Sequence, residues 1–400
     1  HGRSQRLGFR ERWEYAHSLN SLKRNFPNPC KRHSGLDANA WLKKQTEEET
    51  RTTRPFLEHC RRMAGRLFSK GWDRTYREEC RKFRPNTSSR THNVYSDRYW
   101  EGSRNNFLDK VLTGKGVDIT NPSVKLSKIA TPGKMRLITQ YPAECDVLAP
   151  LHKTLYNALR KQKWCLVGPP TQERLESVVG ECERVMSVDL VNATDSLDLK
   201  VTRIILEEAF GSSKFVPGQI RRLAYASLHP LINGRKIAKG QMMGSYLSFP
   251  LLCVQSHCFA TWAGGENVEH LVNGDDTVIA HNKDLRSYPK NVEVNEKKTM
   301  KSKNCLEINS TVFLRKGNRW KEVHHLRRGA YNIDKWSDIV HIAAVCKTSQ
   351  WQDALCKTRI LRRWKMQPFS LGLTSALSRK MQREMGNHYL PCPLIGDNGA

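Results

Sequence analysis

Along the middle of the chain, segments in which every second residue is apolar, and short apolar runs, occur between segments with the 3.6-residue period of a helix. Together they predict short strands between amphipathic helices. KMRLIT (134–139) alternates basic and apolar residues behind a Thr-Pro-Gly turn, and RVMSVDL (184–190) is a short apolar run with Asp189 near its end. Helical periods occupy residues 148–159 and 199–210. We therefore expect strands and helices to share the central half of the chain.

The most distinctive segment is EHLVNGDDTVIA (269–280), in which two apolar runs flank Asn-Gly-Asp-Asp. This pattern predicts a β-hairpin with Asp275 and Asp276 at its tip. Adjacent carboxylates at a tip repel one another unless a cation lies between them and a partner. An ordinary turn is the alternative, because Asn, Gly and Asp all favour turns.

The patterns outside this region are weaker. Residues 1–90 are rich in Arg with a helical stretch at 56–70, and residues 81–93 have the composition of a polar linker. A strongly apolar helix is expected over residues 250–262, with Pro in its first turn. The last ninety residues look mainly helical. No apolar run reaches the roughly 18 residues that a membrane span needs, so no span is expected.

Charge adds the first functional indication. The chain has 67 Lys and Arg against 39 Asp and Glu, a net charge of +28. The net charge is +12 in residues 1–100, +11 in residues 301–400 and +5 between them. A positive field of this kind concentrates polyanions and favours a nucleic-acid partner. The alternative is a basic surface that serves solubility alone.

The 12 cysteines, without a recognisable secretion signal, are expected to be reduced thiols. Cys253, His257 and Cys258 lie close enough in the sequence to suggest zinc ligands. The same spacing fits the buried face of a helix, where Cys acts as a small hydrophobic residue. No second ligand pair stands at a suitable spacing, so the buried face is the preferred interpretation.

A second carboxylate site accompanies the hairpin. Asp189 stands at the end of one apolar strand, and Asp195 follows six positions later as the chain turns into a helix. A carboxylate at a strand end and two at a neighbouring hairpin tip can hold two Mg²⁺ ions for in-line phosphoryl transfer. A helix N-cap or a surface turn remains the alternative for Asp189 alone.

Several segments follow one another in the order of the polymerase motifs F, A, B, C, D and E. On these segments the chain resembles the viral RNA-directed RNA polymerases, most closely the narnavirus and ourmia-like (botourmiavirus-like) group of positive-strand RNA viruses. The segments run from Gly133 to Phe313, a span of close to half of the chain. They are GKMRLIT (133–139) with LHKTLYNAL (151–159), SVDLVNATDSL (187–197), GQMMGSYLSFPLL (240–252), NGDD (273–276), VNEKKTMKS (294–302) and EINSTVF (307–313).

The resemblance implies an α+β fold shaped as a right hand of fingers, palm and thumb, whose antiparallel palm sheet carries the Gly-Asp-Asp hairpin. It implies the following division: a basic N-terminal extension (1–90), fingers (91–184), a palm (185–312) with a finger insertion near 200–239, and a helical basic thumb (313–400).

The resemblance also implies the catalytic roles. Asp189 and Asp275 would be the metal ligands, with Asp276 assisting them, and the ion would be Mg²⁺ with Mn²⁺ as the alternative. Lys298 would act as the general acid that protonates pyrophosphate. An ordinary solvated lysine is the alternative for Lys298.

Other positions correspond to the nucleotide site. Lys134 and Arg136 would lie over the triphosphate, since alternation on a strand points both side chains the same way. Asp195 would lie near the 2′-hydroxyl of the incoming ribose, where an acceptor distinguishes ribonucleotides. A mobile loop beside the template and nucleotide would contain Gly240, Gly244 and Ser245.

The motif B helix departs from the family pattern because it lacks the Asn that bonds the ribose-selecting Asp in many related polymerases. The substitutes considered are Ser248, Gln255 and Ser256. The residues given the least functional weight, as turn and capping positions, are Glu307, Asn309 and Ser310.

We therefore expect an RNA-directed RNA polymerase that replicates a viral RNA genome from NTPs, with RNA template and product as partners. A reverse transcriptase is disfavoured, because an aromatic residue usually stands near Asp-Asp in those enzymes. A non-enzymatic RNA-binding protein explains the charge but not the focused carboxylates. The expected location is the host-cell cytoplasm, with the mitochondrion as the alternative. Host or viral protein partners are not predicted.

Overall fold

The computed structural model describes residues 7–21, 29, 35–47, 52–83, 104–131, 134–180, 182–290, 292–317 and 319–323. The chain divides into two units. The smaller comprises residues 1–30, 131–134 and 323–400, and its described part contains helix α1 (Phe9–Ser21), with an Arg10–Glu14 ion pair of 3.2 Å along its surface. The larger comprises residues 31–130 and 135–322 and carries the predicted polymerase motifs.

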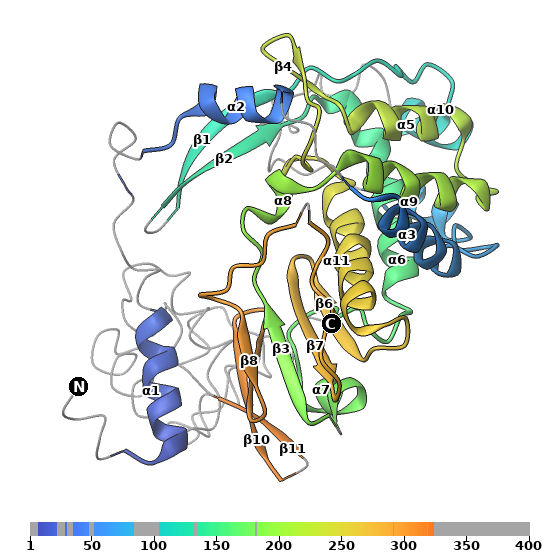
Figure 1. Ribbon diagram of the computed structural model, residues 1–400. Helices are drawn as coiled ribbons and strands as arrows, with labels where there is room; N and C mark the ends of the chain where they lie inside the picture. The colour runs from blue at the N-terminus through green and yellow to red at the C-terminus, as the bar shows by residue number, and fades with distance from the viewer. Residues whose placement is uncertain are drawn as a thin grey trace, which may run out of the picture. The chain divides into compact units, whose positions relative to one another are not determined.

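Most of the described helices of the larger unit lie together on the side of the strands where α11 lies (Figure 1). The described helices of this unit are α2 (Ala38–Glu47), α3 (Arg54–Leu67), α4 (Tyr76–Lys82), α5 (Arg104–Thr113), the 3-10 helix η3 (Ala143–Leu148), α6 (Ala149–Leu159), α7 (Gln172–Val179), α8 (Ala193–Ser196), α9 (Leu199–Gly211), α10 (Gly218–Ser227) and α11 (Ser248–Gly264). None of the helices in the described residues is long and apolar enough to cross a membrane.

The strands form four antiparallel sheets. They are β1 (Lys125–Thr131), β2 (Lys134–Gln140), β3 (Arg184–Val188), β4 (Leu231–Ile232), β5 (Arg235–Lys236), β6 (His270–Asn273), β7 (Asp276–His281), β8 (Met300–Ser302), β9 (Cys305–Ile308), β10 (Thr311–Lys316) and β11 (Arg319–Glu322). The strand orders are β6-β7-β3-β8, β11-β10-β9, β1-β2 and β4-β5. The predicted strands over 134–139 and 184–190, and the predicted hairpin over 269–280, are confirmed as β2, β3 and β6–β7.

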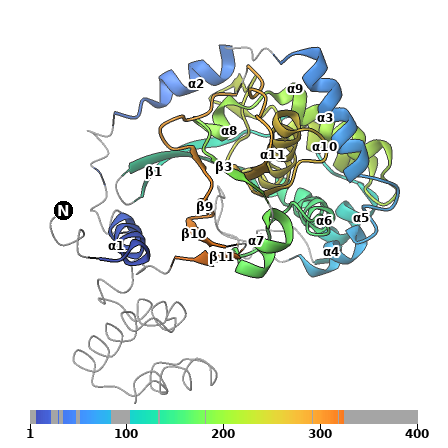
Figure 2. The ribbon, with the colours of Figure 1, turned by 60° about the horizontal axis from the view of Figure 1, so that its bottom comes forward.

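The four-stranded sheet is the palm sheet, and its middle strand β3 is buried on both faces. Side chains alternate along a strand, so neighbouring residues enter different cores. Met186 joins the core beneath α11, while Val185 joins a second core with Phe313 and Trp320. Figures 1 and 2 show α11 beside β6 and β7, with α3 and α9 also in contact with this helix.

The second core contains elements from both sides of two predicted domain boundaries. Helix α7, assigned to the fingers, packs against β6 and β11 beneath the palm sheet through Leu175, Val178 and Val179. The palm was expected to end at residue 312, but that position lies inside β10. Residues 311–322 form the paired strands β10 and β11 on either side of a turn at Gly317, with buried and exposed side chains alternating along β11. A helix, as the start of the thumb, was expected from residue 313. The remainder of the predicted thumb, residues 324–400, lies outside the described residues.

Helix α3 lies within residues 1–90, the predicted basic N-terminal extension, and it packs into the main core of the larger unit. Phe56 stacks on Phe259 of α11 with ring centroids 5.6 Å apart, and Cys60 and Met63 are buried in the same core. This core also contains Ile205 of α9. Helix α3 therefore belongs to the core of the larger unit, because its helical period places one apolar face against α9 and α11.

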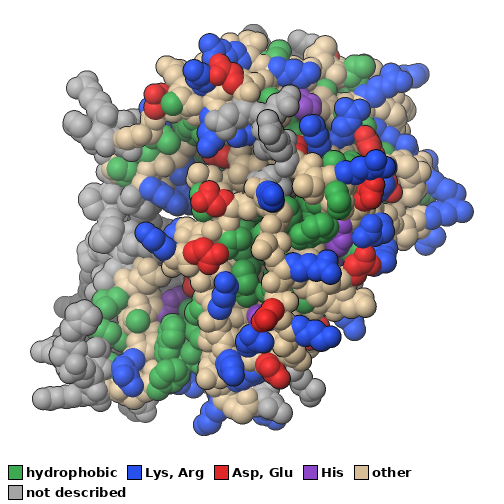
Figure 3. Space-filling view, viewed as in Figure 1, with side chains coloured by type: hydrophobic (Ala, Val, Ile, Leu, Met, Phe, Trp, Pro, Cys, Tyr) green, Lys and Arg blue, Asp and Glu red, His purple; other side chains and the backbone are tan. Residues whose placement is uncertain are grey.

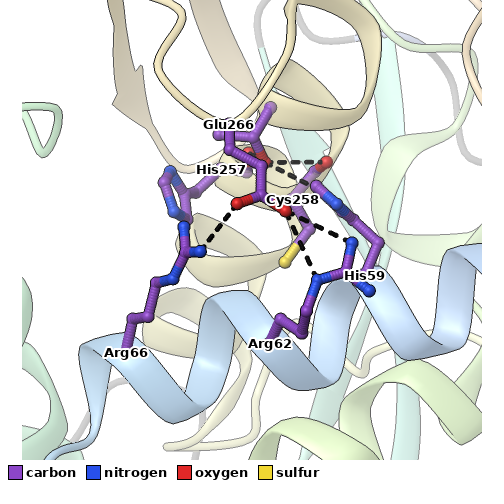
Figure 4. Close-up of polar contacts among 7 residues, drawn as sticks. His59, Arg62, Arg66, His257, Cys258 and Glu266 are labelled. Atoms are coloured by element: carbon purple, nitrogen blue, oxygen red, sulfur yellow. Dashed lines mark hydrogen bonds and ion pairs between the residues drawn. The ribbon is translucent and has the colours of Figure 1, made fainter.

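Polar contacts border this helix pair (Figure 4). Arg62 and Arg66 both reach Glu266, at 3.2 Å and 2.7 Å, and His59 Nε2 lies 2.9 Å from Thr261 Oγ1. Exposed ion pairs contribute about 0–1 kcal/mol each, whereas fully burying one large apolar side chain contributes about 1.5–3 kcal/mol. The buried aromatic and sulfur side chains therefore hold α3 in place, and the ion pairs add to its orientation.

Candidate active site

The two predicted carboxylate segments lie side by side at one end of the palm sheet. β3 and β7 are antiparallel, and Val188 pairs with Thr277. Asp189 directly follows Val188, and Asp276 directly precedes Thr277, so these two aspartates lie on neighbouring strands at the same edge. Asp275 stands in the two-residue turn of the hairpin, since Asn273 pairs with Asp276. The fold thus brings together residues that are more than eighty positions apart.

The electrostatics of Asp276 show that these carboxylates are close enough to affect one another. Burial, followed by the negative charges of Asp275, Glu307 and Asp189, raises the pKa of Asp276 to about 6. A backbone hydrogen bond from Asn309 acts in the opposite direction. The negative charges of these neighbouring carboxylates thus add up at Asp276, and carboxylate oxygens are the ligands that Mg²⁺ prefers.

The side-chain positions do not form a complete metal site. Among the residues that the structure describes, no group of three or more His, Cys, Asp or Glu side chains is gathered closely enough to hold an ion as it stands. This finding also applies to the predicted ligands Asp189, Asp275 and Asp276. The donor set of carboxylate oxygens fits a hard cation such as Mg²⁺.

Lys298 lies beside the carboxylates. Its Nζ is 3.5 Å from Asp189 Oδ2, and its side chain is 69% exposed. The segment around Lys298 is joined to the end of β3 by two hydrogen bonds. The Asn295 N–H donates to the Asp189 carbonyl at 2.8 Å, and the Asp189 N–H donates to Thr299 Oγ1 at 3.1 Å. This segment therefore holds an ammonium group next to the first carboxylate.

The glycine loop before α11 is packed against strand β2. The Gly244 N–H donates to Thr139 Oγ1 at 3.0 Å, and a Cβ on Gly244 would lie 1.8 Å from the Thr139 carbonyl oxygen. No side chain fits such an approach, so glycine is required here. Ser245 and Ser248 lie at the start of α11, where the Ser248 N–H donates to the Ser245 carbonyl at 3.2 Å.

Polar side chains of helix α11 make hydrogen bonds to the hairpin turn and to α9, and none of these bonds goes to Asp195. Ser256 Oγ donates to the Gly274 carbonyl at 2.7 Å, and the Gly274 N–H donates to Cys253 Sγ at 3.3 Å. Gln255 Nε2 donates to Thr202 Oγ1 at 2.9 Å. Gln255 therefore bonds to α9 and Ser256 bonds to the hairpin. The sequence suggested that one of them bonds to Asp195, and the structure shows no such bond in the described residues.

The residues that were weighed as zinc ligands, Cys253, His257 and Cys258, are buried on helix α11. His257 Nδ1 lies 2.8 Å from His270 Nε2, and Trp164 stacks on His257 with ring centroids 4.2 Å apart. Cys253 and Cys258 are buried in the core. The preferred interpretation, a buried helix face, therefore agrees with the structure.

Asp195 belongs to the short helix α8, and its partner comes from a part of the chain to which the sequence gave no role. Trp41 Nε1 donates to Asp195 Oδ2 at 3.0 Å across 154 positions of sequence. Burial raises the pKa of Asp195, and the Trp41 hydrogen bond and the charges of Lys44 and Lys239 oppose that rise. No local pattern could have identified these partners, because only the tertiary fold brings them together.

The remaining predicted residues lie on strands and turns. Lys134 and Arg136 are both exposed and stand two positions apart on β2, as their alternation predicted. Glu307 lies on β9, and its N–H donates to Ser187 Oγ at 2.9 Å. Asn309 and Ser310 form the turn between β9 and β10 with φ of 50° and 55°. The turn interpretation of these two residues is therefore confirmed.

A solved viral polymerase has a similar architecture. The chain resembles the crystal structure of the RNA-dependent RNA polymerase of a human picorbirnavirus, with a TM-score of 0.60 and 11% sequence identity over 92% of this chain and 82% of that chain. At this identity the likeness shows the fold alone. The predicted α+β, right-hand polymerase fold is confirmed.

Sequence comparison identifies the family. No curated protein matches the chain, but the family model of the mitovirus RNA-dependent RNA polymerase matches residues 100–317, more than half of the 400 residues. The match confirms the predicted viral RNA-directed RNA polymerase, with RNA template and NTPs as its partners, and rules out the non-enzymatic alternative. The chain belongs to the mitovirus RNA-dependent RNA polymerase family.

Proposed function

We propose that this RNA-directed RNA polymerase joins nucleotides at the edge formed by Asp189, Asp275 and Asp276, which would hold Mg²⁺, with Mn²⁺ as the alternative ion. The observation that carries the proposal is the pairing of Val188 with Thr277, since this register brings Asp189 beside the hairpin aspartates. When bound, the ions would neutralise the triphosphate and lower the pKa of the attacking hydroxyl. The mutual repulsion that raises the pKa of Asp276 supports the need for a cation.

In the proposed reaction, the 3′-hydroxyl oxygen of the growing RNA attacks the α-phosphorus of the NTP. A new oxygen–phosphorus bond forms while the bond to pyrophosphate breaks, and the proton of the attacking hydroxyl passes to water. Lys298 Nζ donates the proton that the leaving pyrophosphate takes up. The exposure of Lys298 supports this role, because its ion pair with Asp189 contributes about 0–1 kcal/mol and exchanges readily for a phosphate.

The nucleotide would be held by residues on either side of the carboxylates. Arg136 and Lys134 on β2 are proposed to bind the triphosphate, and Asp195 is proposed to accept a hydrogen bond from the ribose 2′-hydroxyl. The loop through Gly244 and Ser245 is proposed to lie beside the base pair. The packing of Gly244 on Thr139 supports this arrangement, because it joins the loop to the strand that carries Arg136.

RNA is proposed to bind through dispersed positive charge. Figure 3 shows Lys and Arg side chains spread over one face of the molecule, with Asp and Glu among them. The net charge of +28 supports contacts with the phosphate backbone, which carry no sequence information.

The test is nucleotide incorporation on an RNA template by the full chain, with NTPs against dNTPs and with Mg²⁺ present or chelated. The proposal predicts incorporation of NTPs that stops when the ion is removed. Equal use of dNTPs would contradict the ribose contact, and incorporation without any divalent ion would contradict the metal assignment.

A further inference from the structure

Helix α2 is attached to the region around the glycine loop by a small core of its own. Leu42 of α2 is buried with Ile232, Ile237 and Met242, and the last of these belongs to the loop before α11. Trp41 is partly buried and packs against the same cluster. The helix is therefore fixed beside α8 by burial, and its side chains have defined positions there.

Trp41 makes the one side-chain hydrogen bond that the Asp195 carboxylate has within the described residues, at 3.0 Å from the indole nitrogen to Oδ2. An indole nitrogen is a donor only, so the bond fixes which carboxylate oxygen it occupies. Lys44 follows Trp41 by three positions, so the two side chains are neighbours on the surface of α2. Its ammonium group adds positive charge near the Asp195 carboxyl.

Gln45 extends the connection to the backbone. We assign its side-chain amide so that the nitrogen faces the two neighbouring acceptors, and it then donates to the carbonyls of Asp195 and Lys239 at 3.1 Å and 3.0 Å. The backbone carbonyl of Gln45 accepts from the Ala238 N–H. The side chain is fully buried. Gly240 has φ of +80°, and a Cβ there would lie 3.0 Å from both the Gln45 amide and the Asp195 carbonyl. The loop, α8 and α2 thus form one packed unit.

We propose that Trp41 is the positioning residue for Asp195, and that α2 sets the sugar selectivity of this polymerase. By occupying Oδ2, the indole N–H leaves Oδ1 directed to the 2′-hydroxyl of the incoming nucleotide. Helix α11 does not supply this contact, because Gln255 and Ser256 bond to Thr202 and Gly274. The inference rests on the proposed role of Asp195 as the acceptor for the 2′-hydroxyl.

The test compares Trp41→Phe, Asp195→Ala and the double variant in the full chain, with kcat and KM measured for GTP and dGTP. Trp41→Phe keeps an aromatic ring but removes the donor, so we expect the GTP:dGTP ratio of kcat/KM to fall by about three- to tenfold. The loss should lie in the KM for GTP, with dGTP kinetics unchanged. The double variant should fall no further than Asp195→Ala alone, because both changes remove one interaction.

Trp72→Phe is the matched control for removing an indole donor, since Trp72 Nε1 bonds to the Ala209 carbonyl at 2.8 Å in the core. It should leave the nucleotide ratio at the wild-type value. Lys44→Met, with Lys43→Met as its neighbour control, tests the same helix without disturbing a buried residue, because both lysines are exposed. Lys44→Met should lower the ratio by about twofold and Lys43→Met should not.

The outcomes distinguish the role of Asp195 as the 2′-hydroxyl acceptor from the role of α2 in positioning it. If Asp195→Ala lowers the ratio and both Trp41→Phe and Lys44→Met leave it unchanged, the positioning role of α2 is wrong and the role of Asp195 stands. If Asp195→Ala itself leaves the ratio unchanged, the proposed role of Asp195 is wrong, and the inference falls with it. If Trp41→Phe slows GTP and dGTP equally, Trp41 is purely structural and the proposal is overturned.

Discussion

Ser256 on α11 donates a 2.7 Å hydrogen bond to the carbonyl of Gly274, the residue before Asp275. Both partners are enclosed between the helix and the hairpin, and Cys253 accepts from the Gly274 N–H on the same side. The helix therefore fixes the turn that presents Asp275. This contact links motif B to motif C directly, through the backbone of the catalytic hairpin.

Ser256→Ala should reduce the catalytic rate because it leaves the Gly274 carbonyl without its donor. We expect a loss of about 1–2 kcal/mol of stability and roughly a tenfold lower kcat, with KM for NTP little changed. Ser227→Ala is the control, since Ser227 is equally buried and bonds within its own helix at 2.8 Å. A Ser256→Ala enzyme with wild-type kcat would show that the hairpin does not depend on this bond.

Gly244→Ala should abolish activity through a steric conflict. The added Cβ would lie 1.8 Å from the Thr139 carbonyl, so the loop and β2 have to separate. Gly211→Ala, at the end of α9, has no heavy atom within 4 Å of the added Cβ and should be tolerated. Thermal unfolding and NTP incorporation measure both variants. Full activity in Gly244→Ala would contradict the packing described for this loop.

The sequence predicted the elements whose pattern is local. The hairpin at 269–280, strand β3 and helix α11 each have a complete hydrophobic period and clear turn residues. The position of Asp189 at a strand end was also recognisable from its neighbours, whereas its place beside the hairpin followed only from the order of the polymerase motifs. These features account for the edge of the palm sheet that carries Asp189, Asp275 and Asp276.

Contacts made across long stretches of sequence were not predictable. Trp41 lies in an ordinary polar helix, and only the packing of Leu42 against Met242 brings it to Asp195. Helix α3 was assigned to an N-terminal extension because the sequence there is rich in Arg. Those charges lie on its exposed face, and the opposite, apolar face contacts Phe259. The strands at 311–322 were missed because their short alternation was read as part of a basic helical region.

The paired histidines beneath the hairpin should make stability fall in mild acid. Burial lowers the pKa of His270 to about 4, and burial followed by the neighbouring His270 lowers that of His257. Both rings are thus neutral in the fold, while an unfolded histidine takes up a proton near pH 6.5. The folded state binds fewer protons, so stability is retained above pH 6.5 and is lost as pH falls towards 4.

His270→Gln should lose part of this acid sensitivity, which amounts to at most about 3 kcal/mol for one such histidine. The measurement is the unfolding temperature at several pH values between 7.5 and 5. His281→Gln, at the far end of the same hairpin, should follow the wild-type profile. Identical slopes for wild type and His270→Gln would show that the buried pair is not the source of the acid sensitivity.

RNA affinity should depend steeply on salt and weakly on sequence. Binding through many phosphates releases counterions, so we expect affinity to fall by roughly a thousandfold between about 50 and 200 mM salt. Unrelated RNAs of equal length should give the same slope. A flat response, or a strong preference for one short sequence, would indicate a specific binding site instead of a polymerase channel.

The most direct test of the catalytic edge is the NTP incorporation rate of Asp275→Asn on an RNA template with Mg²⁺, with RNA affinity and unfolding temperature measured on the same protein. Asp284→Asn is the control, because Asp284 is an exposed carboxylate paired with Arg184 on the same sheet. We expect Asp275→Asn to fall below about a hundredth of the wild-type rate with RNA affinity intact, and Asp284→Asn to stay near it. Turnover above a few per cent in a folded, RNA-binding Asp275→Asn protein would contradict the assignment of this edge as the active site.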